Sequence, residues 1–363
     1  MRILFVARRY PPDVVSGTET VFSKLFTEAI VAGHEVRLVA GFRKDRSLLP
    51  GECRAVDLRG RGAGAWAAIA GAAIREARAF RPDVVLSNAI EVLVPGTPTV
   101  TLVHDLNFGG HGTGLGSTAR RLFYRTQAML LARVIAVSDV TRQQLLDLGI
   151  SGHKVVRIYN GVDVERFAPL TDGPLSRQDG TFRFVHVSRI LPGKAQHASI
   201  DAFGRLRPDQ RKGKALDIVG TVADPLYADQ IRVQGYGLDV GFHFDVPNVA
   251  PYYQRADIAL FPTLMPEGFG FAAVEAMACG LPVIHYADAA VKEATGGHAV
   301  EVARDDPAGL RDAMLRLFSD DNERNSLAER GRAWVQQYRW SKVWAEYAGV
   351  LAAVVGGRAD RAQ

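Results

Sequence analysis

The chain alternates short apolar runs, rich in β-branched residues, with longer amphipathic stretches, and this series occurs twice. The apolar runs lack polar alternation, which is typical of parallel strands covered by helices on both faces. Between the two series, Phe167–Gly180 contains prolines and glycines but no hydrophobic period, so we interpret it as a linker. The sequence therefore predicts an α/β protein of two doubly wound, Rossmann-like domains, whose ligand-binding strand ends face one cleft.

The first domain is predicted to span residues 1–168 and the second residues 169–338. Residues 339–363 are predicted to form a helix that crosses back toward the first domain, and a short tail. The predicted strands are Ile3–Ala7, Glu35–Ala40, Asp83–Ser87, Thr99–His104, Val134–Ala136, Val155–Ile158, Phe182–Val187, Ala215–Val219, Val240–Phe244, Ile258–Phe261, Val283–His285 and Ala299–Val302. The predicted helices are Thr18–Ala32, Gly64–Phe80, Ser117–Leu131, Asp139–Leu148, Ala195–Leu206, Pro225–Gln234, Phe271–Cys279 and Pro307–Ser319.

Positive charge is concentrated in the N-terminal half. Residues 1–170 contain 22 basic and 15 acidic residues, whereas residues 171–363 contain 22 basic and 24 acidic residues. This excess indicates a phosphate-bearing ligand or an anionic membrane surface near the first half, and the alternative is an ordinary solvated surface. The two cysteines, far apart and without metal-ligand spacing, fit a reducing cytoplasm. We also find no signal peptide and no apolar run long enough to span a membrane.

The most informative segment runs from Pro266 to Ile284, where a strand is followed by glycines and then by a helix. Glycines allow the backbone to approach a ligand closely, and the first turn of a helix offers free N–H groups to an anion. Glu267 precedes this helix and Glu275 lies within it. A phosphate held between two carboxylates that bind hydroxyls describes a nucleoside diphosphate sugar. The alternative is an ordinary strand–loop–helix connection with Glu275 on the surface.

A second segment, Ser188–Lys194, follows the first strand of the second series and carries Arg189 and Lys194. Arginine binds phosphate oxygens in a bidentate manner, and lysine adds a point charge. Two fixed cations would neutralise the charge that develops on a departing diphosphate. The alternative is a solvated loop with two basic residues.

The first half offers weaker signals. Gly17, near the start of the first helix, can let phosphate oxygens approach the backbone, but the loop lacks the G-x-G-x-x-G pattern of dinucleotide-binding enzymes. His104-Asp105 ends a predicted strand, where a histidine can donate a hydrogen bond, act as a base or have a structural role. No cluster of carboxylates or histidines requires a metal, so we expect none.

The predicted helix Ser117–Leu131 carries Arg120, Arg121 and Arg125 together with several large apolar residues. A basic amphipathic helix of this kind can lie on anionic lipid. The alternative is a helix packed on the core, with solvated arginines.

These segments together resemble the retaining glycosyltransferases of family 4, which have the GT-B fold. The resemblance extends from Arg2 to about Trp340, and its most specific part is Asn160-Gly161-Val162-Asp163, then Arg189…Lys194, then Glu267–Ile284. Weaker matches are Ala136-Val137-Ser138-Asp139, Ile218-Val219-Gly220 and Ala256-Asp257. Ser16, Ser188 and Ala195 stand where many members of the family have glycine.

The resemblance implies a role for each matched residue. Arg189 and Lys194 would hold the donor diphosphate, and Glu275 would bind the ribose hydroxyls. Glu267 would bind hydroxyls of the donor sugar, together with the amides of Gly268–Phe271. The implied catalytic residues are His104, Glu267, Arg189 and Lys194. The implied donor-binding residues are Gly17, Arg189, Lys194, Val246, Glu267, Gly268, Phe269, Gly270, Phe271 and Glu275.

In the first domain, Gly17 would close over the diphosphate and His104 would orient the transferred sugar. Val246 would lie near the nucleobase. The resemblance also implies front-face attack with retained anomeric configuration, in which the leaving phosphate helps to deprotonate the acceptor, without an enzymic nucleophile or a metal.

We therefore predict a cytoplasmic hexosyltransferase that uses a UDP- or GDP-sugar. Its acceptor would be a glycan, a lipid-linked molecule or a small molecule, in the assembly of surface polysaccharide, glycolipid or natural-product glycans. Peripheral contact with the inner face of the membrane, through the basic first domain, is part of this expectation, and nucleic acid is not an expected partner. The alternatives are a nucleotide-sugar epimerase of the same fold and a non-catalytic nucleotide-sugar-binding protein.

Overall fold

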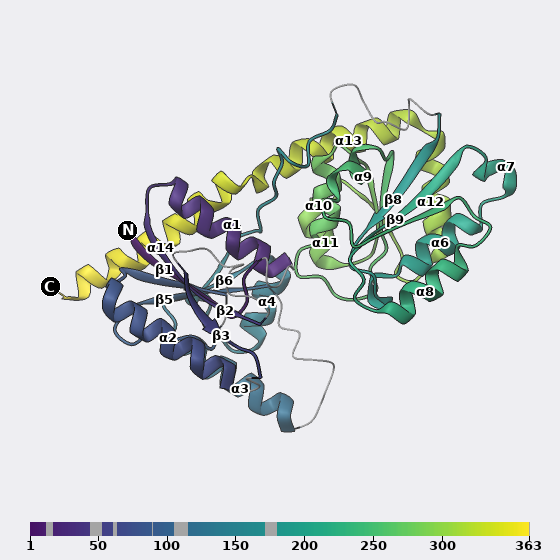
Figure 1. The fold of residues 1–363 in the computed structure, drawn as a ribbon. Coiled ribbons are helices and arrows are strands. Elements are labelled where there is room, and N and C mark those ends of the chain that lie inside the picture. Colours follow the sequence, from purple (N-terminus) through teal and green to yellow (C-terminus); the bar gives the residue numbers. More distant parts are fainter. Residues whose placement is uncertain are drawn as a thin grey trace. The chain divides into compact units, whose positions relative to one another are not determined.

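The computed structural model describes residues 1–11, 17–43, 53–60, 64–88, 90–104, 115–170 and 180–362. The chain divides into two compact units. Unit 1 comprises Met1–Gly161 and Trp340–Gln363, and unit 2 comprises Val162–Arg339. Each unit is built around one parallel sheet with helices on both faces (Figure 1). The prediction of two doubly wound α/β units is confirmed.

The described part of unit 1 contains a seven-stranded parallel sheet in the order β3-β2-β1-β4-β5-β6-β7. The strands are β1 (Arg2–Ala7), β2 (Glu35–Phe42), β3 (Cys53–Asp57), β4 (Val84–Ser87), β5 (Thr99–Val103), β6 (Arg133–Ala136) and β7 (Val155–Arg157). The helices are α1 (Gly17–Val31), α2 (Gly64–Phe80), α3 (Leu115–Leu130), α4 (Asp139–Asp147) and the returning α14 (Trp340–Ala362).

Alternating residues of β1 explain why both faces of this sheet are covered. Leu4 and Val6 point to the side of α2, where they share a buried cluster with Ile69. Phe5 points to the other side, where its ring lies 5.4 Å from Phe22 and 5.2 Å from Phe26 of α1, measured between centroids. Burial of each such side chain stabilises the folded state by about 1.5–3 kcal/mol. The strand can therefore be apolar along its whole length.

The described part of unit 2 contains a six-stranded parallel sheet in the order β10-β9-β8-β11-β12-β13. The strands are β8 (Phe182–Val187), β9 (Lys214–Gly220), β10 (Val240–Phe244), β11 (Ile258–Phe261), β12 (Val283–Tyr286) and β13 (Val300–Val302). The helices are α6 (Gln196–Gly204), α7 (Pro208–Arg211), α8 (Pro225–Gln234), α9 (Ala250–Gln254), α10 (Phe271–Ala278), α11 (Ala289–Thr295), α12 (Pro307–Ser319) and α13 (Asp321–Val335).

Two boundaries of the prediction need correction. The predicted linker starts at Phe167, but the chain already enters unit 2 at Val162. The ring of Phe167 is buried against Tyr253 of α9, 6.0 Å between centroids, and so belongs to unit 2. Residues 171–179 of that linker lie outside the described residues. The predicted helix from Ala195 instead begins at Gln196, because Pro192–Lys194 form a 3₁₀ turn and Ala195 has a left-handed backbone with φ of 55°.

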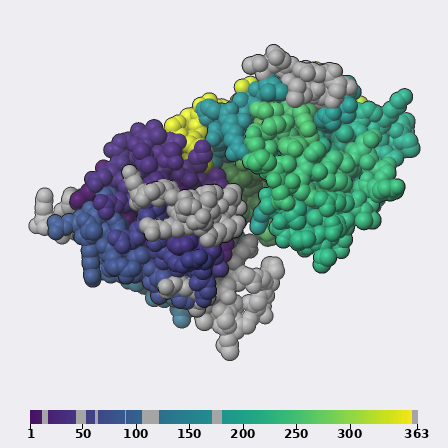
Figure 2. Space-filling model, viewed as in Figure 1, coloured from purple at the N-terminus to yellow at the C-terminus, as the bar shows by residue number. Residues whose placement is uncertain are grey.

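The chain passes between the units at Gly161 and returns at Trp340. A side chain at Gly161 would meet the Trp340 ring at 2.4 Å, so only glycine fits there. On the unit 2 side, Val162 N donates to Tyr338 O at 2.7 Å. After its return the chain forms α14, which packs beside α1 (Figure 1, Figure 2).

Candidate functional site

In an open parallel sheet, ligands bind beyond the carboxyl ends of the strands, where neighbouring connections leave in opposite directions. In unit 2 this point lies between β8 and β11, since β8 leads to β9 on one side and β11 leads to β12 on the other. The connection after β8 contains Arg189 and Lys194, and the connection after β11 contains Glu267. The fold thus brings the two predicted segments to one edge.

The two connections are bound to each other by their backbones. Gly193 O accepts hydrogen bonds from Leu264 N at 2.9 Å and Met265 N at 3.0 Å, and Thr263 Oγ1 lies 3.3 Å from it. The 3₁₀ turn at Pro192–Lys194 is therefore held in a fixed position against the loop that carries Glu267.

This arrangement turns Lys194 inward to form an ion pair with Glu267. The two side chains are 11% and 14% exposed, and Thr263 Oγ1 donates to Glu267 Oε1 at 3.1 Å. Losing one member of such a buried pair would leave an uncompensated charge, so each partner fixes the other. Lys194 and Glu267 are therefore one charged unit. The roles predicted from the sequence, with Lys194 on phosphate and Glu267 on the sugar, therefore concern two side chains that are in contact.

Arg189 lies at the same edge with an exposed side chain. Within the described ranges it forms no ion pair, and its carbonyl oxygen accepts a hydrogen bond from Gln196 Nε2 at 2.8 Å. Its guanidinium donors thus remain available to an anionic ligand.

The helix α10 begins at this edge with Gly270 as its N-cap, at φ of 91°. A side chain there would be strained and would meet Val291 Cγ2 at 3.1 Å. The ring of Phe269 is buried, 5.3 Å from the rings of Phe271 and Tyr338. Phe269 thus has a core side chain, so the predicted role in ligand binding falls to its backbone.

Glu275 lies on α10, partly buried beside Tyr253 and Arg166. Burial raises the pKa of its carboxyl to about 7, and the charge of Arg166 and the hydroxyl of Tyr253 oppose that rise. Arg166 Nη2 is held by Asn248 Oδ1 at 2.9 Å. The carboxyl therefore changes charge near neutral pH.

The sequence did not indicate a buried network of hydrogen-bonded polar side chains that lies behind Arg189. His186, fully buried in β8, has Nδ1 at 2.9 Å from Ser199 Oγ and Nε2 at 3.0 Å from Ser188 Oγ. Gln196 Nε2 donates to Ser188 Oγ, as well as to Arg189 O, at 2.8 Å. Burial, with the charges of Lys194 and His197, lowers the pKa of His186 to about 3, so its imidazole is neutral.

This network fixes the backbone from which Arg189 projects. The one signal in the sequence was the polar His186 within the apolar residues Phe184–Val187.

Val246 follows β10, two strands away from β8, and is partly buried. The preceding Asp245 has φ of 54°, and its Oδ1 accepts from Val222 N at 2.9 Å, which fixes the turn.

The remaining predicted residues lie in unit 1. Gly17 is the exposed first residue of α1, and His104 follows β5, whereas Ser16 and Asp105 lie outside the described residues. Burial lowers the pKa of His104 to about 4, so its imidazole is neutral at ordinary pH. Its backbone oxygen accepts from Thr141 Oγ1 at 3.4 Å. A neutral imidazole orients a hydroxyl better than it attracts an anion.

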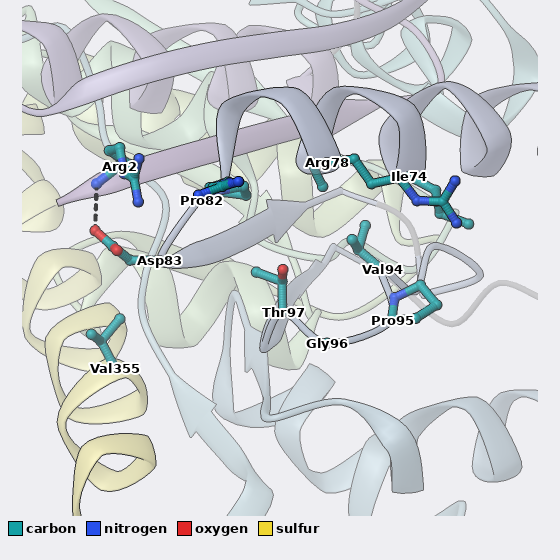
Figure 3. Close-up of a pocket in the computed structure, with 12 residues that line it drawn as sticks. Arg2, Ile74, Arg78, Pro82, Asp83, Val94, Pro95, Gly96, Thr97 and Val355 are labelled. Carbon is teal, nitrogen blue, oxygen red and sulfur yellow. Dashed lines mark hydrogen bonds between the residues drawn. The ribbon is translucent and has the colours of Figure 1, made fainter. Parts of the chain in front are cut away.

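Unit 1 also has a groove of about 660 Å³ at the amino ends of its strands, lined by Arg2, Arg78, Asp83 and Val355, among others (Figure 3). Arg2 N donates to Asp83 Oδ2 at 2.7 Å. This groove lies at the opposite edge of the sheet from His104, so it is separate from the predicted site.

Among the described residues, no three His, Cys, Asp or Glu side chains are placed to hold a metal ion. Of the helices in the described ranges, none is long and apolar enough to cross a membrane.

Two doubly wound parallel units joined by a returning C-terminal helix define the GT-B class of fold, which solved structures confirm. The Anabaena Alr3699/HepE structure in complex with UDP-glucose matches with a TM-score of 0.79 at 20% identity, over 97% of this chain and 100% of that chain. Sucrose-phosphate synthase from Thermosynechococcus elongatus matches with a TM-score of 0.79 at 18% identity, over 98% and 99%.

Two family models match the sequence. "Glycosyltransferase Family 4" matches residues 15–166, and "Glycosyl transferases group 1" matches residues 171–334. The chain therefore belongs to the family 4 type of glycosyltransferase, and it is a glycosyltransferase enzyme.

Curated relatives agree with this assignment. Glycogen synthase from Mycobacterium tuberculosis is 27% identical over 98% of this chain and 96% of its own length. A phosphatidyl-myo-inositol mannosyltransferase from the same organism is 32% identical over 62% and 60%. A third protein from that species, a GDP-mannose-dependent alpha-(1-6)-phosphatidylinositol dimannoside mannosyltransferase, is 27% identical over 98% and 97%.

Proposed function

We propose that this enzyme transfers a hexose-type sugar from a UDP- or GDP-linked donor to an acceptor hydroxyl, with retention of anomeric configuration. The carrying observation is the buried Lys194–Glu267 pair, fixed where the β8 and β11 connections diverge and next to the start of α10. A fixed cation, an exposed arginine and free helix amides on one edge suit a diphosphate, and carboxylates on both sides suit hydroxyls.

In this proposal, Arg189 and Lys194 bind the diphosphate, and the amides of Gly268–Phe271 assist them. Lys194 has N–H donors beyond the one that Glu267 takes, and Glu267 has a second oxygen for a sugar hydroxyl. Glu275 binds the ribose, and Val246 lies near the base. For Gly17 and the neutral His104 of unit 1 the proposal keeps the roles that the resemblance implies, toward the diphosphate and the transferred sugar.

The proposed chemistry is attack by the acceptor hydroxyl on the same face from which the diphosphate leaves. The bond from the anomeric carbon to the leaving phosphate oxygen breaks, the bond to the acceptor oxygen forms, and the acceptor proton passes to the leaving phosphate. Arg189 and Lys194 stabilise the charge that develops on that phosphate, which is where fixed cations accelerate a reaction most. No residue is assigned as a nucleophile and no metal is assigned a step.

We further propose a lipid-linked acceptor reached by peripheral membrane contact at the cytoplasmic face, with α3 as the contact. Its Leu122, Phe123, Met129 and Leu130 are 63%, 44%, 68% and 66% exposed. At helical spacing they form one stripe, and the exposed Arg121 and Arg125 lie beside it. Apolar residues flanked by cations favour anionic lipid. The names of two mannosyltransferase relatives include phosphatidylinositol, which supports this class of acceptor.

The direct test is a panel of UDP- and GDP-sugars incubated with and without phosphatidylinositol vesicles, sugars and a glycan acceptor. We expect one donor to release its nucleoside diphosphate only when an acceptor is present. NMR of the product should show that the anomeric configuration of the donor sugar is retained. Transfer with inversion would refute retention. Proton exchange at sugar C2 without transfer would identify an epimerase instead.

A further inference from the structure

A group of unpartnered polar atoms lies at the carboxyl edge of the unit 1 sheet. Of the buried side-chain atoms without a hydrogen-bond partner in the described part of the chain, three belong to residues that directly follow a strand, namely Arg8 (Nε), Asn88 (Oδ1) and His104 (Nε2), and another is Thr101 Oγ1 within β5. Buried polar atoms are nearly always paired, so several orphans together require an explanation.

The sheet register brings Arg8, Asn88 and His104 to neighbouring strand ends, whereas Thr101 lies two residues inside the end of β5. Val6 of β1 pairs with Ser87 of β4, which in turn pairs with Thr101 of β5. Arg8 follows β1, Asn88 follows β4 and His104 follows β5. The order of strands reverses between β1 and β4, so this edge is also the ligand-binding edge of unit 1.

Positive charge is concentrated at the same edge. Arg9 and Arg43, which follows β2, lie near enough to act on Arg8 electrostatically. Glu91 and Tyr124 act on it in the opposite sense. Its guanidinium carbon lies 4.8 Å from the centroid of the Trp66 ring, which holds the side chain in place. A partly buried guanidinium with further cations nearby favours an anion.

The donor and acceptor pattern defines the ligand further. Arg8 offers N–H donors to an anionic group, whereas the oxygen of Asn88 accepts from a hydroxyl. The neutral imidazole of His104 can do either, depending on its tautomer. We infer that this edge binds an acceptor that carries a phosphate beside its hydroxyls. This inference rests on the proposed function, because it names the acceptor class of the same reaction.

The groove at the opposite edge supplies a matched control. Arg2 begins β1 and lines that groove, whereas Arg8 follows the end of the same strand (Figure 3). The two arginines therefore differ in the edge that they occupy. Neither Arg2 nor its groove neighbours Arg78 and Arg81 contributes an orphaned buried atom within the described residues.

The test is calorimetric titration of the full chain with glucose and with glucose 6-phosphate. We expect the phosphate ester to bind about tenfold or more tightly than glucose, since charge-assisted hydrogen bonds are the strong ones. Arg8→Gln should abolish that preference, Arg8→Lys should keep part of it, and Arg2→Gln should leave it unchanged. Equal binding of both probes, absence of binding, or loss in Arg2→Gln alone would overturn the inference.

Two additional measurements distinguish failure of this inference from failure of the proposed function, and identify the source of the phosphate. Binding of a nucleotide sugar, which depends on Glu275 in unit 2, reports on the proposed function and on the folding of each variant. Donor binding without a phosphate preference would therefore defeat this inference alone. Sedimentation with phosphatidylcholine vesicles, with and without phosphatidylinositol, shows whether a lipid supplies the phosphate, since only that source makes vesicle binding depend on Arg8.

Discussion

The carboxyl edges of the two sheets differ in how far they satisfy their own polar groups. In unit 2 the loops after β8 and β11 share hydrogen bonds to Gly193 O, and Lys194 is paired with Glu267. In unit 1, Arg8, Asn88 and His104 each keep a buried atom without a partner. We interpret the first edge as preorganised for a constant donor diphosphate, and the second as completed by the acceptor. Enzymes of one fold can use different acceptors, because the residues of the binding site, and not the fold, determine which molecule binds.

The largest expected effect tests the preorganised edge. Lys194→Ala should lower turnover by about 100- to 1,000-fold, because it removes a fixed cation from the leaving phosphate and leaves Glu267 buried and unpaired. Steady-state kinetics measures this, with the exposed Lys212→Ala as the control. Turnover close to that of Lys212→Ala would show that the pair has no role in the reaction.

The next prediction separates chemistry from binding. Arg189→Ala should lower kcat by about 100-fold with little change in donor KM, since its cation matters most as charge develops. Glu275→Ala should mainly raise donor KM. Measuring both constants for both variants distinguishes the roles, and the reverse pattern would contradict them.

A smaller effect concerns pH and stability. The pKa of Glu275 rises from its ordinary 4.5 to about 7 on folding, so the folded state binds more protons between these values. Stability should therefore fall as pH rises through that window and level off above about 7. Because the carboxyl is partly exposed, we expect a loss of about 2 kcal/mol.

Urea unfolding at several pH values measures this loss in the free energy of unfolding. Glu275→Gln should lack this component of the pH dependence. An identical pH profile for the variant and the wild type would contradict the assignment.

The smallest expected effect tests the network behind Arg189. Gln196→Leu should lower kcat by about tenfold, because the hydrogen bonds from Gln196 Nε2 to Ser188 Oγ and Arg189 O are lost. In combination with Arg189→Ala the losses should not add, since both act through the same guanidinium. Gln234→Leu, which removes a bond to His197 O, is the control. Additive losses would indicate a purely structural role.

The sequence predicted best those elements whose ends are fixed by local chemistry. The bounds of α8 and α12 match the prediction, because Asp224 and Asp306 cap them and a proline follows each cap. The short strand β3 was missed, since Arg54 and Asp57 interrupt its apolar pattern. Phe167 was assigned to a linker because its packing partner, Tyr253, is distant in sequence.

The site shows the same division. Arg189, Lys194, Glu267 and Glu275 occur in spaced motifs, so the sequence indicated them. The sequence did not predict the contact between Lys194 and Glu267, because it forms only when β8 and β11 become neighbours in the sheet.

His186, Gln196, Arg8 and Asn88 belong to no spaced motif, so only the fold reveals them. Each is a polar residue within or just beyond a buried strand or turn. Their common feature is a long-range contact or an orphaned atom, and neither is visible in local sequence.

We propose above that the carboxyl edge of the unit 2 sheet binds a nucleoside diphosphate sugar. Calorimetry with UDP-glucose and GDP-mannose on the wild type, Lys194→Ala and Glu275→Ala tests it most directly. We expect one donor to bind the wild type and both substitutions to weaken that binding. Binding of neither donor, or equal affinity in all three proteins, would show that this edge is not the donor site.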